Sequence, residues 1–567
     1  MGGNNNGQLL VLPQAEDAGD SFSTSPTPAE NTPLLRSETA SSHTARDGVS
    51  LQKDEALGWK RTVAIVLSMW ILIFLQAGNM SGISTIQSTI AAELNAYEHA
   101  MWFTSSYLIT MSSVAPLVGR LAMVFSPGAM ILFSSVFFSI GAVVTGQAHD
   151  FVTFILGRVL VGIGGGGVMT LSLILVIQLT SKKRRGLMIG LTNAGFTIGL
   201  SVGAVIFGTL LPVIGWASMP PSAAHPTSKS KTTLQKLASV DYLGATTLTL
   251  TIVLFLYSLS TPQIQTPLLL LSILLLLPFF LLIESVASTP ILPLPILAHR
   301  GILLSCLSQL AFMAARWTIL YYSPVFGLAV LGLSPGAAGA MLIPTNIGFG
   351  SGGLVIGHLH IRRAGSFWLP CVVSLFCFGL VLYSLSFVST KAAPGPYLYV
   401  FTIFLHGICT GGALNYTLAH LLHLSEPGTH FIVTGLLSTF RGFAGSFGTA
   451  IGGGVFGRTL AGVLEEGFGR LDGNGGGGLS EARKQLIVRL VGSPAAVYQV
   501  GVLTDAERLI AIGGYETALK VLYRGAAAVC VLVLFLQAGT GWTGPVSEEE
   551  EEEIEEAIVE HDGLMEA

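Results

Sequence analysis

Charged residues are scarce in this chain of 567 residues. Asp, Glu, Lys and Arg together make up 11% of it, whereas soluble domains carry about 25%. Hydrophobic residues make up 51%, and the mean hydropathy is +0.67. This composition excludes an ordinary soluble domain and predicts a polytopic membrane protein embedded in the lipid bilayer. The formal net charge of −4 is inflated by the acidic run from Glu548 to Glu556 and indicates no nucleic-acid partner.

The sequence also lacks the patterns that soluble enzymes use. The four glycines from Gly164 to Gly167 lie inside an apolar run without a flanking strand, so they do not form a nucleotide-binding loop. No Ser-His-Asp or metal-ligand constellation is found on a soluble element. The five cysteines all fall in apolar runs without metal or disulfide spacing, at Cys306, Cys371, Cys377, Cys409 and Cys530. We therefore expect no enzyme activity, no cofactor and no metal.

Long apolar runs, by contrast, recur along the chain. A helix that crosses about 30 Å of hydrocarbon needs about 20 mostly apolar residues. Runs of this kind predict spans at 62–86, 99–122, 128–147, 152–178, 187–211, 242–260, 266–285, 302–328, 336–357, 366–388, 397–419, 431–455 and 515–537. The expected fold class is an all-α membrane protein. Basic residues at Lys60-Arg61 and Lys182 to Arg185 place the N-terminus in the cytosol by the positive-inside rule.

Polar segments flank and interrupt these runs. Residues 1–58 predict a disordered cytosolic tail, and 541–567 an acidic cytosolic tail. The segment 456–514 is expected to be a non-cytosolic loop with a surface helix near Leu486 to Val491. Within the first tail, Glu30, Leu34 and Leu35 resemble an acidic dileucine sorting signal, which would bind sorting adaptors and direct the protein to the vacuole.

Small residues and one arginine mark the fourth and fifth runs. Arg158 lies inside an apolar run, where a charge is costly and should face a bundle interior. Glycines at spacings that let helices approach closely in lipid follow it, at Gly162, Gly164, Gly190, Gly199, Gly203 and Gly208. With Gly119 to Met123 between the second and third runs, this arrangement resembles the major facilitator superfamily. The closest resemblance is to its fourteen-helix drug:H+ antiporter branch, which includes the fungal vacuolar basic amino acid transporters.

Three positions depart from the motifs of that branch. Val161 stands in place of a polar residue, Ala204 in place of a proline, and Met123 in place of an aspartate. The resemblance implies a major facilitator fold of two six-helix bundles plus two extra helices. It assigns 59–211 to the N-terminal bundle (helices 1–5), 242–285 to the linking helices and 286–540 to the C-terminal bundle.

The sixth helix of that architecture is not found. Residues 212–241 form a polar stretch with Pro220, Pro221, Pro226 and several lysines, which cannot be a membrane helix. We expect helix 6 to be missing or truncated, through a gene-model error or a real loss. The alternative is an interfacial segment at 205–222 that dips into the membrane.

Intramembrane polar residues are the candidates for a substrate or proton pathway. Asn79 stands where the drug antiporters usually carry an aspartate, and an amide cannot take up a proton near neutral pH. Arg316 is a candidate to bind a carboxylate, and His406 to titrate near physiological pH; each has a purely structural alternative. The full set is Asn79, Gln87, Trp102, Tyr107, Arg158, Asn193, Arg316, Tyr321, His406, Asn415 and Arg441.

The sequence therefore predicts a transporter of small organic solutes that works by proton-coupled alternating access. Vacuolar basic amino acid transport at the vacuolar membrane is the preferred hypothesis, although no acidic cavity residue supports a cationic substrate. A plasma-membrane multidrug or toxin exporter is the second hypothesis. A decayed paralogue that no longer transports is the third.

Overall fold

The computed structural model describes residues 59–179, 195–207, 241–287, 294–359, 366–425, 429–472 and 479–542, without 101, 262 and 393 but with the single residues 209, 290 and 292. The chain divides into two compact units, Met1–Leu57 and Gly58–Ala567, and all described residues belong to the second. Ten helices in this part of the chain are long and apolar enough to cross a membrane, and the segment Gly195–Phe207 is a shorter apolar helix. The expected all-α membrane fold is confirmed.

The first bundle consists of α1 (Trp59–Glu93), α2 (Trp102–Val124), α3 (Pro127–Gly146), α4 (Phe151–Leu179) and the helix Gly195–Phe207. The short helix η1 (Tyr97–His99) joins α1 to α2. Glycines allow these helices to touch. A Cβ atom on Gly203 would lie 2.2 Å from the Cα atom of Gly78, and one on Gly164 would lie 2.4 Å from the backbone nitrogen of Phe138. Only glycine fits at these two crossings.

Two linking helices follow the first bundle. The first is α7 (Tyr242–Ser260), which begins where the Asp241 carboxylate accepts a 2.7 Å hydrogen bond from the Gly244 backbone N–H. The second is a continuous apolar rod made of α8 (Thr266–Leu270), the π-helical turn η2 (Leu271–Leu276) and α9 (Leu277–Val286). Helix α7 packs against both α2 and α16, so it bridges the two bundles.

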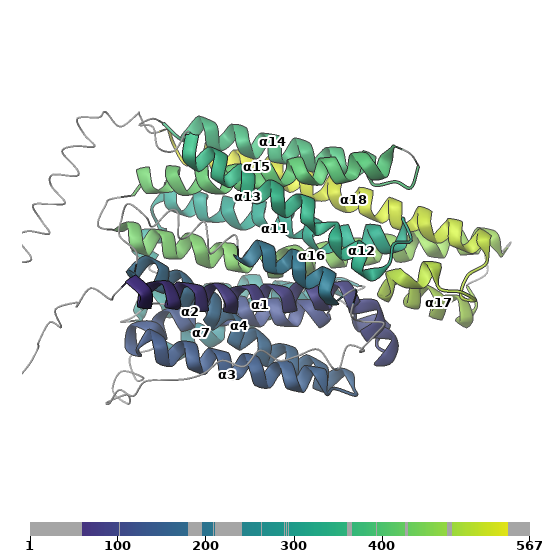
Figure 1. Cartoon of the computed structure of the whole chain (residues 1–567), viewed down its shortest axis with the longest axis horizontal. Coiled ribbons are helices and arrows are strands. Elements are labelled where there is room, and N and C mark those ends of the chain that lie inside the picture. Colours follow the sequence, from purple (N-terminus) through teal and green to yellow (C-terminus); the bar gives the residue numbers. More distant parts are fainter. Residues whose placement is uncertain are drawn as a thin grey trace, which may run out of the picture. The chain divides into compact units, whose positions relative to one another are not determined.

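The second bundle is built from α11 (Arg300–Ala329), α12 (Pro335–Ala340), α13 (Leu342–Leu359), α14 (Trp368–Val388), α15 (Gly395–His423), α16 (His430–Leu471) and α18 (Asp505–Ala538), with the short α10 (Leu294–Leu297) before it. In Figure 1, α3 of the first bundle lies at one edge of the packed helices and α14 of the second bundle at the opposite edge, with α1, α11 and α16 between them. The two bundles meet where α16 contacts α2 and α1 contacts α11 and α12.

The segment 456–514, which was expected to be a loop, is largely helical. Helix α16 continues to Leu471, and α18 already begins at Asp505 behind a capping box formed by Thr504 and Glu507. The cause is a buried stripe at every fourth residue of α16, at Phe456, Leu460, Leu464 and Phe468, which packs in the same core cluster as α18. The expected surface helix is present as α17 (Glu481–Gly492), followed by η4 (Pro494–Tyr498).

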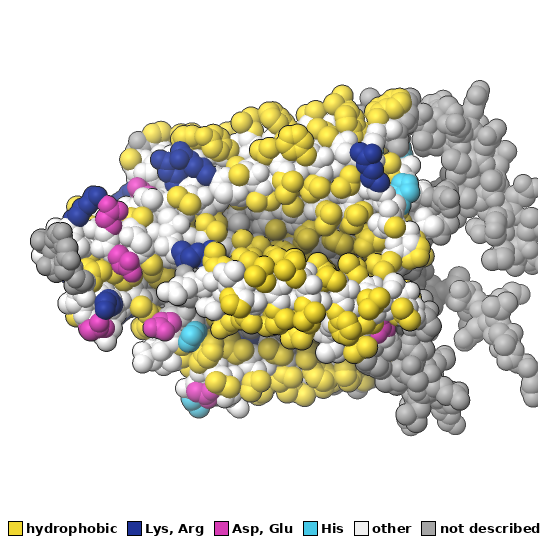
Figure 2. Space-filling view, turned by 180° about the vertical axis from the view of Figure 1, so that it is seen from behind, with side chains coloured by type: hydrophobic (Ala, Val, Ile, Leu, Met, Phe, Trp, Pro, Cys, Tyr) yellow, Lys and Arg dark blue, Asp and Glu magenta, His cyan; other side chains and the backbone are white. Residues whose placement is uncertain are grey.

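The outer faces of the helices are apolar. Figure 2 shows hydrophobic side chains over most of one face, while most of the charged side chains visible there lie toward the ends of the helices. The linking rod is the clearest case, since Leu274 is 67% and Leu282 is 61% exposed. Leucines exposed in such numbers on a helix of spanning length fit a lipid-facing surface.

Several expectations lie outside the described residues. These are the polar stretch up to residue 240 where helix 6 was sought, the sorting signal at Glu30, Leu34 and Leu35, and the site and packing residues Gly190, Asn193 and Gly208.

Candidate functional site: a small cavity between two helical bundles

Arg158 is fully buried in the first bundle and joins three helices. Its Nη1 atom donates a 2.8 Å hydrogen bond to the side-chain oxygen of Asn79 on α1, and its Nε atom donates a 2.8 Å bond to the Phe103 carbonyl on α2. The guanidinium also lies 4.7 Å from the ring centre of Tyr107. Its Nη2 atom is buried without a hydrogen-bond partner among the described residues. Asn79, Tyr107 and Arg158 therefore form one cluster, in which the arginine charge meets an amide and not a carboxylate.

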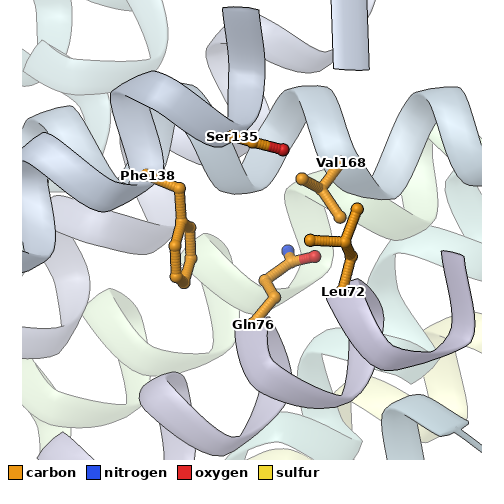
Figure 3. Close-up of a pocket in the computed structure, with 5 residues that line it drawn as sticks. All are labelled: Leu72, Gln76, Ser135, Phe138 and Val168. Atoms are coloured by element: carbon orange, nitrogen blue, oxygen red, sulfur yellow. The ribbon is translucent and has the colours of Figure 1, made fainter. Parts of the chain in front are cut away.

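Gln76, which the sequence did not single out, extends this cluster. Its Nε2 atom lies 3.3 Å from the Tyr107 hydroxyl and 3.3 Å from the sulfur of Met111. Figure 3 shows its amide pointing into a small pocket that Leu72, Ser135, Phe138 and Val168 complete. The Oε1 atom of Gln76 and the Oγ atom of Ser135 have no hydrogen-bond partner among the described residues. A polar pocket of this kind is a place for an ordered water molecule.

A second cavity lies between the two bundles. Its lining is uncharged and comes from α1, α2, the helix Gly195–Phe207, α11 and α13, through Met80, Ser81, Ser84, Thr104, Leu200, Trp317, Leu320, Tyr321 and Leu342. The volume open to water is about 20 Å³, which is enough for one or two water molecules. An organic solute does not fit into a volume of this size.

Hydrogen bonds between side chains also cross from one bundle to the other. Tyr321 on α11 donates to the side-chain oxygen of Gln87 on α1. Asn346 on α13 donates a 2.8 Å bond to the Ser201 hydroxyl of the first bundle, and the hydroxyls of Ser112 and Ser446 lie 2.9 Å apart. Gln87 and Tyr321, both predicted from the sequence, are thus in contact. Ser201 and Asn346 were missed because isolated polar residues in helices without a motif give no signal of their partner.

The remaining cationic candidates gather in the second bundle. Arg316 on α11 is 4% exposed, and its guanidinium carbon lies 4.3 Å from the ring centre of Phe349 on α13. It interacts electrostatically with Arg441 on α16 and with His406 on α15. The structure therefore brings Arg316, His406 and Arg441 into one region that holds two arginine charges, separate from the Arg158 cluster.

Two candidates have a packing role instead. Trp102 lies with its ring 5.5 Å from that of Tyr257 on α7, outside the set of residues that line the cavity. Asn415 on α15 donates a 2.8 Å hydrogen bond to the carbonyl of Gly353, which ties α15 to α13.

Comparisons with known proteins agree with this architecture. The chain is 26% identical to the multidrug resistance protein fnx1 of Schizosaccharomyces pombe over 428 residues, which is 71% of this chain and 80% of the relative. It is 25% identical to the vacuolar basic amino acid transporter 1 of Saccharomyces cerevisiae over 341 residues, 56% of this chain and 60% of the relative. It is also similar, at 24% identity, to the multidrug resistance protein 3 of Bacillus subtilis, with coverage of 78% and 87%.

A solved structure shares the fold. It is the inward-facing, occupied form of a bacterial homologue of the human lysosomal transporter Spinster. The TM-score is 0.56 at 15% identity, with 85% of this chain and 98% of that chain covered. The Major Facilitator Superfamily model matches residues 69–449. That match covers more than half of the sequence, and it includes the Arg158 cluster and the cavity between the bundles, so the chain belongs to the Major Facilitator Superfamily.

Proposed function

We propose that this protein moves small organic solutes by alternating access at the cavity between its two bundles. The observation that carries the proposal is that cavity, which is lined by both bundles and too small for an organic solute in this structure. A solute enters such a site only when the bundles rock apart. The bonds Tyr321–Gln87 and Asn346–Ser201 cross the interface and would have to break during opening.

Proton coupling is part of the proposal and rests on the family. Relatives named as multidrug resistance proteins and as a vacuolar transporter support a membrane transporter, but the proton carrier in this chain is a separate matter. The helix α1 position that resembles the usual acid is Asn79, whose oxygen accepts a hydrogen bond from Arg158. An amide in this place cannot exchange a proton near neutral pH, so coupling would need a different titratable group.

Vacuolar transport of basic amino acids is the first candidate. Two features support it, namely the relative that bears this name and the dileucine pattern at Glu30, Leu34 and Leu35. The lining of the cavity opposes it, because a lysine or arginine side chain would find no carboxylate among the described lining residues. The replacement of Leu34 and Leu35 by alanine should move a tagged protein away from the vacuolar membrane, and unchanged localisation would contradict this assignment.

Export of neutral or weakly polar metabolites or drugs is the second candidate. Aromatic, aliphatic and hydroxyl groups make up the described lining, through residues such as Trp317, Tyr321 and Ser84. Such a surface is typical of sites for amphipathic organic molecules. If helix 6 is truly lost, however, the protein would be a paralogue that reaches its membrane and transports nothing. Transcript sequence across Trp216 would separate a real loss from a gene-model error.

The decisive experiment is uptake by vacuolar vesicles energised with ATP. Labelled lysine, arginine and histidine would be offered to vesicles with and without the protein, in the presence and absence of a protonophore. Uptake that depends on the protein and disappears with the protonophore would establish proton-coupled vacuolar transport. An absence of uptake, with the protein shown to be in the membrane, would leave the exporter and the decayed paralogue, which drug-resistance tests in cells then distinguish.

A further inference from the structure

We propose that Arg316 and His406 form a subsite for a carboxylate, and that this subsite receives the carboxylate of the transported solute. The inference rests on the proposed transport function and specifies its substrate class as carboxylate-bearing organic molecules. It follows from four features of the second bundle: a buried arginine with an unpaired donor atom, a buried histidine without hydrogen bonds among the described residues, the absence of Asp and Glu from α11, α13, α14 and α15, and the nearness of the cavity.

Arg316 packs against an aromatic ring, but one of its donor atoms has no hydrogen-bond partner among the described residues. Arg316 is 4% exposed, and its Nη1 atom is buried without a hydrogen-bond partner in the described part of the chain. The face of Phe349 supports the guanidinium at 4.3 Å. An aromatic face stabilises a cation but accepts no conventional hydrogen bond in the plane of the guanidinium. That plane carries the donors that match a carboxylate.

His406 also lacks hydrogen-bond partners among the described residues. His406 is fully buried, and neither of its ring nitrogens has a hydrogen-bond partner among the described residues. The ring packs 4.4 Å from that of Phe378. The next residue, Gly407, lies against the backbone of Phe349, whose ring covers the Arg316 guanidinium. A buried polar group without a partner costs about 1–3 kcal/mol. A ligand that accepts a hydrogen bond from the imidazole N–H would remove this cost.

Four of the helices around Arg316 and His406 supply no counter-charge. No Asp or Glu occurs in α11, α13, α14 or α15. On α16, Arg441 adds a second positive charge near Arg316, and the first acid beyond it, Glu465, is about 36 Å further along the helix. The buried charge of Arg316, whose Nη1 atom has no partner among the described residues, is unfavourable in a dry interior without an anion. An anionic ligand would supply that partner.

The subsite lies beside the cavity between the bundles. Trp317, the neighbour of Arg316 in sequence, lines that cavity, as does Leu342 one turn before Thr345. A Cβ atom on Gly407 would lie 2.1 Å from the Thr345 carbonyl oxygen, so the backbone next to His406 touches α13 at this turn. The Thr345 hydroxyl is a further buried group without a partner in the described residues. A solute in the opened cavity could thus place a carboxylate against Arg316 and His406.

A monoanionic carboxylate fits better than the alternatives. A cation would be repelled by Arg316 and Arg441. A phosphate dianion needs more donors than one free guanidinium edge and one imidazole N–H provide. Chloride has the right charge, but it gains nothing from the planar fork of an arginine, whereas a carboxylate accepts two parallel hydrogen bonds from it.

The test is thermal unfolding of the purified full-length protein in detergent micelles, without a gradient. Sodium benzoate is the probe, with benzamide as its neutral isostere and sodium chloride as the inorganic anion. We expect benzoate to raise the unfolding midpoint saturably and benzamide and chloride to leave it unchanged. Arg316→Gln should weaken the apparent benzoate affinity about ten- to hundred-fold, as the loss of a charged hydrogen bond does. Arg316→Lys and His406→Gln should give smaller losses.

Arg524→Gln is the matched control, because Arg524 is an exposed arginine of the same bundle that lies over Phe387. It should retain full benzoate binding. Equal shifts with benzoate and benzamide, or unchanged affinity in both Arg316 variants, would overturn the subsite. A saturable chloride shift as large as that of benzoate would overturn its assignment to the solute. Benzoate binding without any solute transport would sustain the subsite and refute the transport function, and transport without benzoate binding would do the reverse.

Discussion

Replacing Asn79 by alanine tests how the buried Arg158 is held. In the structure, Nη1 of Arg158 donates to Asn79 and Nε donates to the Phe103 carbonyl, while Nη2 has no partner among the described residues. The alanine variant would leave two donor nitrogens of the guanidinium, Nη1 and Nη2, unpaired in a fully buried position. Hydrogen bonds that involve a charged group contribute about 1.5–3 kcal/mol. We therefore expect the free energy of unfolding to fall by about that amount.

Asn415→Ala is the matched comparison, because Asn415 donates a bond of the same length, 2.8 Å, to a neutral carbonyl. Its loss should cost only about 0.5–1.5 kcal/mol. The assay is reversible unfolding of the full-length protein by sodium dodecyl sulfate in mixed micelles, followed by tryptophan fluorescence. An Asn79→Ala protein that is as stable as the wild type, or less affected than Asn415→Ala, would refute the view that Asn79 satisfies the buried charge.

Three further predictions concern packing, gating and pH. Gly203→Ala should sharply lower the yield of folded protein in gel filtration, since its Cβ would lie 2.2 Å from a backbone atom of α1, whereas Gly350→Ala, which meets nothing within 4 Å, should be tolerated. Tyr321→Phe removes a bond between the bundles and should increase the labelling of a cysteine introduced into the cavity. Arg483 donates hydrogen bonds of 2.8 and 2.9 Å to Asp472 and holds the pKa of Asp472 below its ordinary value of 3.8. Because a depressed pKa gives stability that is lost only as the pH falls through it, the hydrogen-exchange protection factors of α17, which correct for the pH dependence of the intrinsic rate, should be unchanged between neutral pH and about pH 5. In Arg483→Gln, α17 should exchange faster at both pH values.

Most of the spanning helices could be predicted from the sequence, because a helix in lipid must be both long and apolar. Runs of about 20 apolar residues predict helices, and the spans expected at 242–260 and 128–147 agree closely with α7 and α3. The same rule failed at the end of α16. There the helix leaves the apolar stretch, and its last turns are held by a stripe from Phe456 to Phe468 packed with α18. A hydropathy average does not detect such a stripe, because Arg458, Glu465 and Glu466 lie among its members and lower the mean.

The sequence predicted only some of the residues of the candidate site. A charge inside an apolar run marks Arg158 and Arg316 as unusual without any structure. The sequence does not state their partners, because the residues that contact Arg158 are 55 and 79 positions away from it. Nor could it separate Trp102, which packs on a linking helix, from Trp317, which lines the cavity. Both are tryptophans in apolar surroundings.

Asn79→Asp would place a carboxylate next to the buried Arg158 and so change the charge of the first bundle. In the wild type, Arg158 meets an amide, and the second bundle holds Arg316 and Arg441 on helices whose spanning parts contain no acid. An aspartate at position 79 would gain about 4 kcal/mol of attraction to Arg158 at about 4 Å and an effective dielectric constant of about 20. Burial of the carboxylate costs several kcal/mol, so the net change in stability should be small.

The change in selectivity should be large, because the first bundle would then offer an anionic, titratable group beside the cavity. Uptake of labelled lysine by vesicles should rise relative to wild type, and binding of benzoate should be retained, since Arg316 is untouched. Unchanged lysine uptake in a folded Asn79→Asp protein would show that position 79 does not set the charge preference of this transporter.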